Sequence, residues 1–289
     1  MLEPARGCSE DLIFSVLSAT IFMWSLYILA NKYLKLEEVK EKSSDHGWSD
    51  LCPLKFSFSD GANSDLVLPR SRSVEVPHIS QLSNWDCGLA CILMVLQTMG
   101  ISNCSLHSLE KLCGTRSIWT VDLAYLLQSF SVIFSYFTVT LGANPNFSME
   151  SYYKDQLPHD LVRVDLLFQK ALEAGIKIEC RSFSGEEVSI LILSGKYIAI
   201  ALVDHYKLSC SQSRQEDGGV SDCCLSNIGY TGHYVVICGY DADRDEFEIR
   251  DPASSSKYER VYSKHLDEAR KSFGTDEDLL LISLEQRYN

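Results

Sequence analysis

The chain places a cysteine at the point where a polar loop turns into an apolar helix. In residues 86–99, DCGLACILMVLQTM, apolar side chains recur every three or four positions, which is the spacing of a helix. We expect Asp86 to cap this helix and Cys87 to lie in its first turn, where the helix dipole stabilises a thiolate. This segment therefore constrains both the hydrophobic core and a candidate site.

Two later segments supply the partners that a nucleophilic thiol needs. His233 opens the run HYVVICGY, which has the composition of a buried strand. A polar turn at residues 241–245 follows, and residues 247–251 return as a second strand that ends at Asp251. A hairpin of this length brings Asp251 near His233, where a carboxylate fixes the tautomer of the imidazole. The pattern predicts a catalytic group of Cys87, His233 and Asp251.

Residues around the cysteine complete the predicted site. Gln81 offers a side-chain amide to a developing oxyanion, beside the backbone N–H of Cys87. Trp85, Asp86 and Gly88 flank the thiol and are predicted to contact the substrate, with Gly88 leaving room beside the sulfur. The structural alternative for Cys87 is a small buried core residue, which is the commonest role of a single cysteine.

The same residues carry a resemblance to a known group of enzymes. Gln81, Asp86-Cys87-Gly88, His233 with its apolar strand, and Asp251-Pro252 resemble the C39-like branch of the papain-like cysteine peptidases. The resemblance implies an α+β fold in which N-terminal helices pack on an antiparallel sheet, and the order of predicted elements agrees with it. We expect helices at residues 86–99, 118–130 (capped by Ser117), 160–174 and 264–272, and strands at 74–78, 176–180, 197–203, 233–240, 247–251 and 279–284.

A wider resemblance covers most of the chain, from about Val74 to Glu285. Residues 85–91 (WDCGLAC), 117–125 (SIWTVDLAY), 230–240 (YTGHYVVICGY) and 272–278 (SFGTDED) look like the plant guanylyl cyclase family. This resemblance implies formation of cyclic GMP and diphosphate from GTP, with Mg²⁺ as the cofactor.

The residues themselves do not show the usual signs of nucleotide chemistry. The sequence contains no G-x-x-x-x-G-K-[ST] phosphate-binding loop. Cyclisation needs a metal on the triphosphate and activation of the ribose 3′-hydroxyl. Asp276 and Asp278, with Glu277 between them, are the first choice of metal ligands, and Asp241 with Asp243 is the second. The structural alternative for both groups is a solvated turn.

Three classes of function remain open at this stage. The leading interpretation is a guanylyl cyclase, because that resemblance covers the whole domain. The alternative is a papain-like thiol hydrolase that uses Cys87, His233 and Asp251 on a peptide, ester or isopeptide bond. The third is a non-catalytic relative that keeps the fold and binds a ligand without turnover.

Composition limits the partners. The net charge of −13 disfavours nucleic acid, so we expect GTP, another small molecule or a peptide as the ligand. Eleven cysteines without a C-x-x-C pair make a zinc ribbon improbable and indicate a reducing, cytoplasmic location.

We expect three regions along the chain. Residues 1–36 form an N-terminal apolar helix, residues 37–72 a flexible linker, and residues 73–287 the guanylyl cyclase or C39-like domain. Residues 12–30 lack charge and are a candidate membrane anchor of borderline length. The alternatives are a helix packed on the domain and a translation start at Met23 that leaves a short apolar stub.

Overall fold

The structure is a computed structural model that describes residues 68–150, 152, 156–209 and 230–285. The described residues fall in one compact unit that begins at Asp65. The predicted apolar helix at residues 1–36 and nearly all of the predicted linker lie outside this description. Within the described ranges, none of the helices combines the length and the apolar character needed to cross a bilayer.

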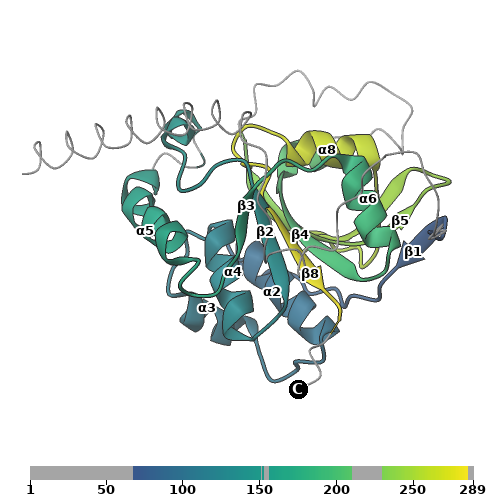
Figure 1. The fold of residues 1–289 in the computed structure, drawn as a ribbon, viewed down its shortest axis with the longest axis horizontal. Coiled ribbons are helices and arrows are strands. Elements are labelled where there is room, and N and C mark those ends of the chain that lie inside the picture. Colours follow the sequence, from purple (N-terminus) through teal and green to yellow (C-terminus); the bar gives the residue numbers. More distant parts are fainter. Residues whose placement is uncertain (1–67, 151, 153–155, 210–229, 286–289) are drawn as a thin grey trace, which may run out of the picture. The chain divides into compact units, whose positions relative to one another are not determined.

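One sheet organises the described part of the chain, and eight strands contribute to it (Figure 1). The strands are β1 (Ser71–Ser73), β2 (Phe134–Thr138), β3 (Ile178–Cys180), β4 (Tyr197–Asp204), β5 (Gly232–Asp241), β6 (Glu246–Arg250), β7 (Glu259–Tyr262) and β8 (Leu279–Ser283). Their order is β3-β2-β8-β4-β5-β6-β7, and β1 pairs with the end of β5. Only β2 and β3 run parallel among these pairs. The fold is therefore α+β with a largely antiparallel sheet, as predicted.

Helices cover both faces of this sheet (Figure 1). They are α2 (Cys87–Thr98), α3 (Leu106–Cys113), α4 (Thr120–Ser129), α5 (Leu157–Lys170), α6 (Gly185–Leu193) and α8 (Ser263–Arg270), with a short 3-10 helix η1 (Pro145–Met149). Figure 1 shows α2 to α5 on one side and α6 and α8 on the other. Both α2 and α6 contact β5, so the central strand is sandwiched between them.

The pattern of β5 explains why it can be buried on both faces. Tyr234, Val236 and Cys238 belong to the core cluster that includes α2 and α4. Val235 and Ile237 alternate with them and are also fully buried, so they face the opposite side of the sheet. A continuous apolar run is typical of a strand covered by helices on both faces.

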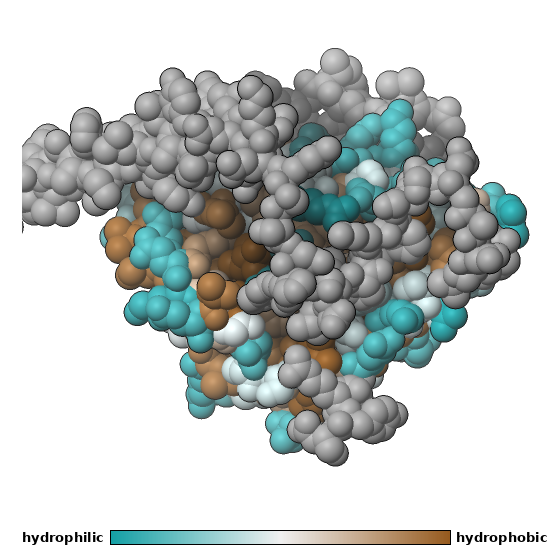
Figure 2. Space-filling model, viewed as in Figure 1, coloured by the Kyte–Doolittle hydropathy of each residue, from teal (hydrophilic) through white to brown (hydrophobic). Residues whose placement is uncertain are grey.

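The outer face of α5 is less completely covered. Val164 is fully buried, whereas Val162 is 68% exposed and Leu166 45% exposed. Figure 2 shows apolar residues, in brown, on the surface that carries α3, α4 and α5. The helix therefore packs along a narrow stripe only.

The predicted elements agree with the structure where apolar periodicity is strong. The helix at Cys87–Thr98 and strands β4, β5, β6 and β8 lie within two residues of the predictions. The strand predicted at residues 74–78 is wrong, because the chain forms β1 at Ser71–Ser73 instead, across the predicted boundary between the linker (37–72) and the domain (73–287). Ser117 does not cap α4; its hydroxyl donates to Asp160, and α4 begins at Thr120. Besides β1, five elements were not predicted: α3, α6, β2, β7 and η1.

Candidate active site

Cys87 is the first residue of α2 and is only 5% exposed. The first hydrogen bond of the helix runs from the amide of Ala90 to the carbonyl of Asp86, at 3.0 Å. The amides of the first turn therefore have no partner inside the helix and point toward the thiol end of the site. This placement agrees with the position predicted from the sequence.

Asp86 does not cap the helix as expected. Its carboxylate accepts hydrogen bonds from the backbone amides of Leu82, at 3.2 Å, and Ser83, at 3.0 Å. No side-chain cap bond is formed at the start of α2. Asp86 therefore fixes the loop that precedes the cysteine, and its contact with a substrate stays a prediction.

His233 and Asp251 meet at one end of the sheet. His233 is the second residue of β5, and Asp251 directly follows β6. The ring Nε2 of His233 lies 2.7 Å from Oδ1 of Asp251, and the same oxygen accepts a 2.7 Å bond from the amide of Ala253. Both side chains are buried, so the pair is shielded from water.

The electrostatics of this pair favour a charged imidazole. Burial opposes the charge on His233, but the hydrogen bonds to Asp251 and Cys87 outweigh it and raise the pKa of His233 to about 9. Burial also opposes the charge on Asp251, yet the contact with His233 lowers the pKa of this carboxyl below its usual value. Because Nε2 is engaged by Asp251, Nδ1 is the nitrogen left for Cys87. The structure thus brings together the three predicted residues in the order thiol, imidazole, carboxylate.

Gln81 is held beside this group by its backbone. Its amide donates to the carbonyl of Pro252 at 2.9 Å, which ties the loop before α2 to the turn after Asp251. Its side-chain Nε2 donates to the carbonyl of Ser83 at 2.7 Å, and its buried Oε1 has no partner among the described atoms. Since Nε2 carries two hydrogens, one remains for a ligand. The oxyanion role of Gln81 stays a prediction.

A cavity of about 130 Å³ opens beside Cys87. Aromatic and acidic side chains line much of it, including Trp85, Trp119, Tyr152, Tyr234, Asp276 and Asp278. Of the three residues predicted to contact substrate, only Trp85 lies on this wall. The guanidinium of Arg116, at the same cavity, sits 5.3 Å from the centre of the Trp85 ring.

The structure gives Gly88 a different role from the predicted one. A Cβ at this position would lie 3.0 Å from Cδ1 of Leu123 and 3.1 Å from Cδ2 of Tyr234. The glycine therefore lets α2 approach α4 and β5 closely, and the space beside it is filled by core side chains. The prediction that Gly88 leaves room for a substrate is wrong.

Asp276 and Asp278 reach the cavity from an unusual turn. Gly274, Asp276 and Glu277 have φ angles of 105°, 49° and 54°, a left-handed conformation that is uncommon outside glycine. The hydroxyl of Tyr136 donates to Oδ2 of Asp278 at 3.1 Å, while the buried Oδ1 has no hydrogen-bond partner within the described residues. Strain and an unpaired buried oxygen mark this turn as a functional candidate.

The third acid of this group does not join the pair. Glu277 accepts a 2.5 Å hydrogen bond from the hydroxyl of Ser182, away from the cavity. Burial raises the pKa of Asp276 to about 6. Burial, reinforced by the charge of Asp276, raises the pKa of Asp278 well above its usual value. The sequence did not indicate that these two carboxyls share a cavity with Cys87.

The carboxylates of the second predicted group of metal ligands contact other groups of the protein. Asp241 accepts the amide of Asp243 at 3.0 Å and faces Arg260 at 3.5 Å, and Asp243 pairs with Arg70. These residues close the hairpin between β5 and β6. The structure therefore gives them a structural role.

His205 is a further neighbour of the site that was not predicted. It follows β4 directly, and its ring centre lies 4.4 Å from that of His233. Val203 pairs with His233 in the sheet, so the register of β4 against β5 places His205 beside His233. Burial, followed by the charge of His233, lowers the pKa of His205. The signal in the sequence was a histidine at the end of the strand that neighbours the His233 strand.

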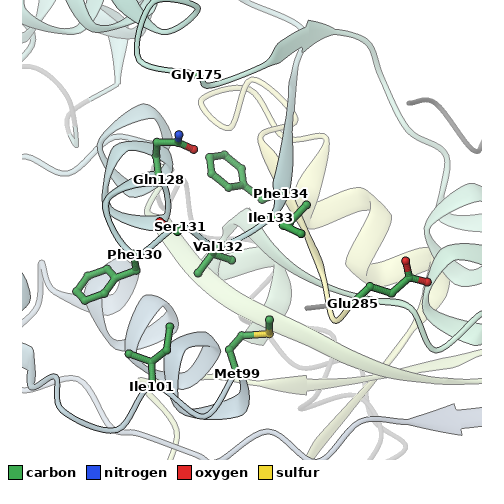
Figure 3. Close-up of a pocket in the computed structure, with 10 residues that line it drawn as sticks. All are labelled: Met99, Ile101, Gln128, Phe130, Ser131, Val132, Ile133, Phe134, Gly175 and Glu285. Atoms are coloured by element: carbon green, nitrogen blue, oxygen red, sulfur yellow. The ribbon is translucent and has the colours of Figure 1, made fainter. Parts of the chain in front are cut away.

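A larger cavity of about 690 Å³ lies apart from these residues. Figure 3 shows apolar side chains on its wall, among them Met99, Phe130 and Val132, although polar atoms make up more of the accessible lining. Glu285 is the only acidic or basic side chain among its ten lining residues in the described part of the chain. The chemistry of the molecule is therefore concentrated in the smaller cavity at Cys87.

Comparison with known proteins identifies the family. Residues 76–282 match the family described as guanylylate cyclase. The chain belongs to the guanylylate cyclase family. Within this family it is 60% identical to "Guanylyl cyclase 1" of Arabidopsis thaliana over 272 residues, which cover 92% of this chain and 98% of the relative.

Three solved structures with a similar course of the chain are described as peptidases or proteases. A C39-like peptidase from Bacillus anthracis has a TM-score of 0.43 at 15% identity, over 72% of this chain and 94% of its own. The peptidase domain of Streptococcus ComA has a TM-score of 0.37 at 12% identity, over 72% of this chain and 98% of that domain. Xylellain, a cysteine protease from Xylella fastidiosa, has a TM-score of 0.40 at 13% identity, over 76% of this chain and 87% of its own.

Proposed function

We propose that this chain forms cyclic GMP and diphosphate from GTP. The observation that carries the proposal is its 60% identity, over 92% of its length, to a relative named guanylyl cyclase. At this level of identity over nearly the whole chain, the same reaction is the first expectation for both chains.

The acidic pair of the cavity fits a magnesium ion. Mg²⁺ is usually held by one or two carboxylates together with substrate phosphates and water. Asp276 and Asp278 supply that number of carboxylates, and Oδ1 of Asp278 is buried without a partner among the described atoms. When bound there, Mg²⁺ would neutralise negative charge on the triphosphate.

The other groups of the cavity suit parts of a nucleotide. Arg116 has an exposed side chain that can contact phosphate oxygens, and the aromatic ring of Trp85 lies against it. With a pKa of about 6, the carboxyl group of Asp276 is largely charged near neutral pH, as a ligand of Mg²⁺ has to be. The volume of about 130 Å³ admits only part of GTP, so the remainder lies outside the cavity.

The test is a direct assay of cyclic GMP formation on purified protein with GTP and Mg²⁺. We expect wild type and Cys87→Ala to form cyclic GMP, because cyclisation does not need the thiol as a nucleophile. The double variant Asp276→Asn with Asp278→Asn should form no cyclic GMP, although its circular dichroism spectrum should show that it is folded. The absence of cyclic GMP with folded wild type would overturn the proposal, and activity in the double variant would remove the acidic pair from it.

A second candidate function is thiol-dependent hydrolysis of an acyl bond. The specific observation in its favour is the group of Cys87, His233 and Asp251 at the start of a helix. In this reaction the thiol proton lies on Nδ1 of His233, which makes the imidazole charged, and the thiolate of Cys87 attacks a carbonyl carbon. Gln81 and the backbone amide of Cys87 would stabilise the oxyanion.

The rest of this cycle uses the same groups. The protonated imidazole gives its proton to the leaving amine or alcohol, which departs as the acyl-enzyme forms. Water then attacks the thioester, gives a proton to His233 and releases the carboxylic acid, which restores the thiol. Asp251 holds the ring in the required tautomer throughout.

The two candidate functions separate cleanly by experiment. A panel of peptide, isopeptide and ester substrates is incubated with wild type and Cys87→Ala, with and without EDTA. Hydrolysis that depends on Cys87 and survives EDTA supports the hydrolase. Hydrolysis by Cys87→Ala at the wild-type rate, or none by folded wild type on any substrate, counts against it.

A further inference from the structure

Two histidines and one carboxylate converge beside the thiol. His205, His233 and Asp251 each present one potential ligand atom, and these atoms all lie within 4.8 Å of one another. Within the described residues, this is the one group of at least three histidine, cysteine or acidic side chains with that closeness. His205 has no part in either reaction proposed above, so its position invites a separate explanation.

The donor set matches a particular class of ion. Imidazole nitrogen and carboxylate oxygen are the ligands of Zn²⁺ and of related divalent ions such as Co²⁺. In a tetrahedral site with bonds of about 2.0–2.1 Å, ligand atoms lie about 3.3 Å apart. The observed separations, from 2.7 Å between His233 and Asp251 up to the 4.8 Å limit of the group, bracket that value. Small side-chain rotations suffice to form the site.

The surroundings suit a bound cation with an open fourth position. His233 and Asp251 are buried, whereas His205 is half exposed and gives access from solvent. Asp204 and Glu259 lie near enough to influence His205 and add negative charge around the group. The neighbouring His78 is not available, because its Nε2 contacts the backbone oxygen of Asp251 at 2.8 Å. Water would complete the tetrahedron.

We propose that His205, His233 and Asp251 form a binding site for a zinc-class divalent ion that switches off the thiol of Cys87. The ion binds Nε2 of His233, the nitrogen that contacts Asp251 in this structure. Asp251 supplies the second ligand and His205 the third. The proton that the charged imidazole holds on Nε2 passes to solvent, and the one remaining ring proton of His233 stays on Nδ1, the nitrogen that faces Cys87. A metal-bound imidazole with a proton on Nδ1 cannot accept the thiol proton, so metal binding and proton exchange with Cys87 exclude each other.

This inference is independent of the cyclase and hydrolase proposals. It concerns the protonation of Cys87 and requires no turnover. It also involves a different ion and different ligands from the magnesium site at Asp276 and Asp278, because imidazole ligands favour zinc-class ions over Mg²⁺.

The test uses Co²⁺ as a spectroscopic probe on full-length protein without a histidine tag. Tetrahedral Co²⁺ absorbs visible light, and we expect one equivalent to bind wild type and Zn²⁺ to displace it. His205→Ala should weaken binding by at least about tenfold, since even indirect partners of a metal ligand contribute 10–100-fold. His107→Ala is the matched control, because this histidine side chain is 72% exposed and lies on α3.

Cys87→Ala separates this site from binding to the thiol. We expect it to keep the Co²⁺ spectrum, whereas loss of the spectrum would assign the metal to the sulfur and overturn the proposal. Zn²⁺ should slow alkylation of Cys87 by iodoacetamide in wild type and in His107→Ala but not in His205→Ala. If His205→Ala does not fold, His205→Gln replaces it, with circular dichroism as the check. No stoichiometric Co²⁺ binding to wild type, or undiminished binding to the folded His205 variant, would also refute the site.

Discussion

The carboxylate of Asp251 lies 2.7 Å from Nε2 of His233, and this contact joins the turn after β6 to the start of β5. The same turn accepts the backbone amide of Gln81 through the carbonyl of Pro252. One short segment therefore orients the imidazole and anchors the loop that leads to Cys87. A displacement of this turn would disturb all three groups together.

The first prediction concerns the reactivity of Cys87. The helix start and His233 should make it react with iodoacetamide faster than the other cysteines near neutral pH. Cys91 and Cys238 provide internal comparisons, since burial raises the pKa of both thiols. Mass spectrometry of partially alkylated protein measures the order of labelling. His233→Ala should slow the labelling of Cys87, and a protein labelled first at the exposed Cys180 would contradict the expectation.

The second prediction follows from the pKa of His233. The folded value of about 9 exceeds the usual value of 6.5, so the charged imidazole stabilises the fold fully below pH 6.5. That contribution should be lost as the pH rises through 9, with a total of about 3 kcal/mol. Urea unfolding of wild type and His233→Ala across this range measures it. The difference between the two proteins should shrink with rising pH, and a constant difference would show that folding does not raise the pKa of this imidazole.

The third prediction concerns Asp278. Burial and the charge of Asp276 raise the pKa of this carboxyl, so its neutral form is favoured and its ionisation destabilises the fold as the pH rises. Asp278→Asn keeps an oxygen that can accept from Tyr136 and removes the charge. It should increase the unfolding free energy by about 1–3 kcal/mol at pH 8 and leave it nearly unchanged at pH 4. Thermal unfolding of wild type and Asp278→Asn at both pH values measures the difference. A variant less stable than wild type at pH 8 would contradict the prediction.

The fourth prediction concerns Gly88. A methyl group there meets Leu123 at 3.0 Å and Tyr234 at 3.1 Å, so Gly88→Ala should destabilise the fold by about 1–3 kcal/mol through overpacking. Urea unfolding measures the loss. Leu123→Ala in the same chain should restore part of the lost fit, so the two changes should be less than additive. Wild-type stability in Gly88→Ala would mean that the helix interface is looser than the structure shows.

Strong apolar periodicity made part of the fold predictable. The helix that starts at Cys87 and the strand that starts at Gly232 are buried almost throughout, so their sequences carry the period of the element. The weaker elements lack that signal. In α3 only Leu109 is fully buried, and the helix is marked by the capping box of Ser105 and Ser108 instead. The analogous box of Ser184 and Glu187 marks the start of α6, a local signal that periodicity alone does not register.

Besides Cys87 at the start of α2, the part of the candidate site that could be predicted is the hairpin that carries His233 and Asp251. His233 and Asp251 are joined by one turn, so their proximity follows from local pairing. Asp278 reaches the cavity of Cys87 because β8 inserts between β2 and β4, and this long-range order is not encoded in local periodicity. The position of His205 depends likewise on the register of β4 against β5.

Strand β1 decides where the chain can be shortened. Ser71 to Ser73 pair with Gly239 to Asp241, at the far end of the strand whose first residues include His233. A shortened chain that begins before Arg70 keeps this pairing, together with the bond from Ala242 to the carbonyl of Arg70. A chain that begins at Val74 exposes the edge of β5 at its carboxyl end. Truncation, and any protease cut in this region, therefore acts on the same strand that carries the imidazole.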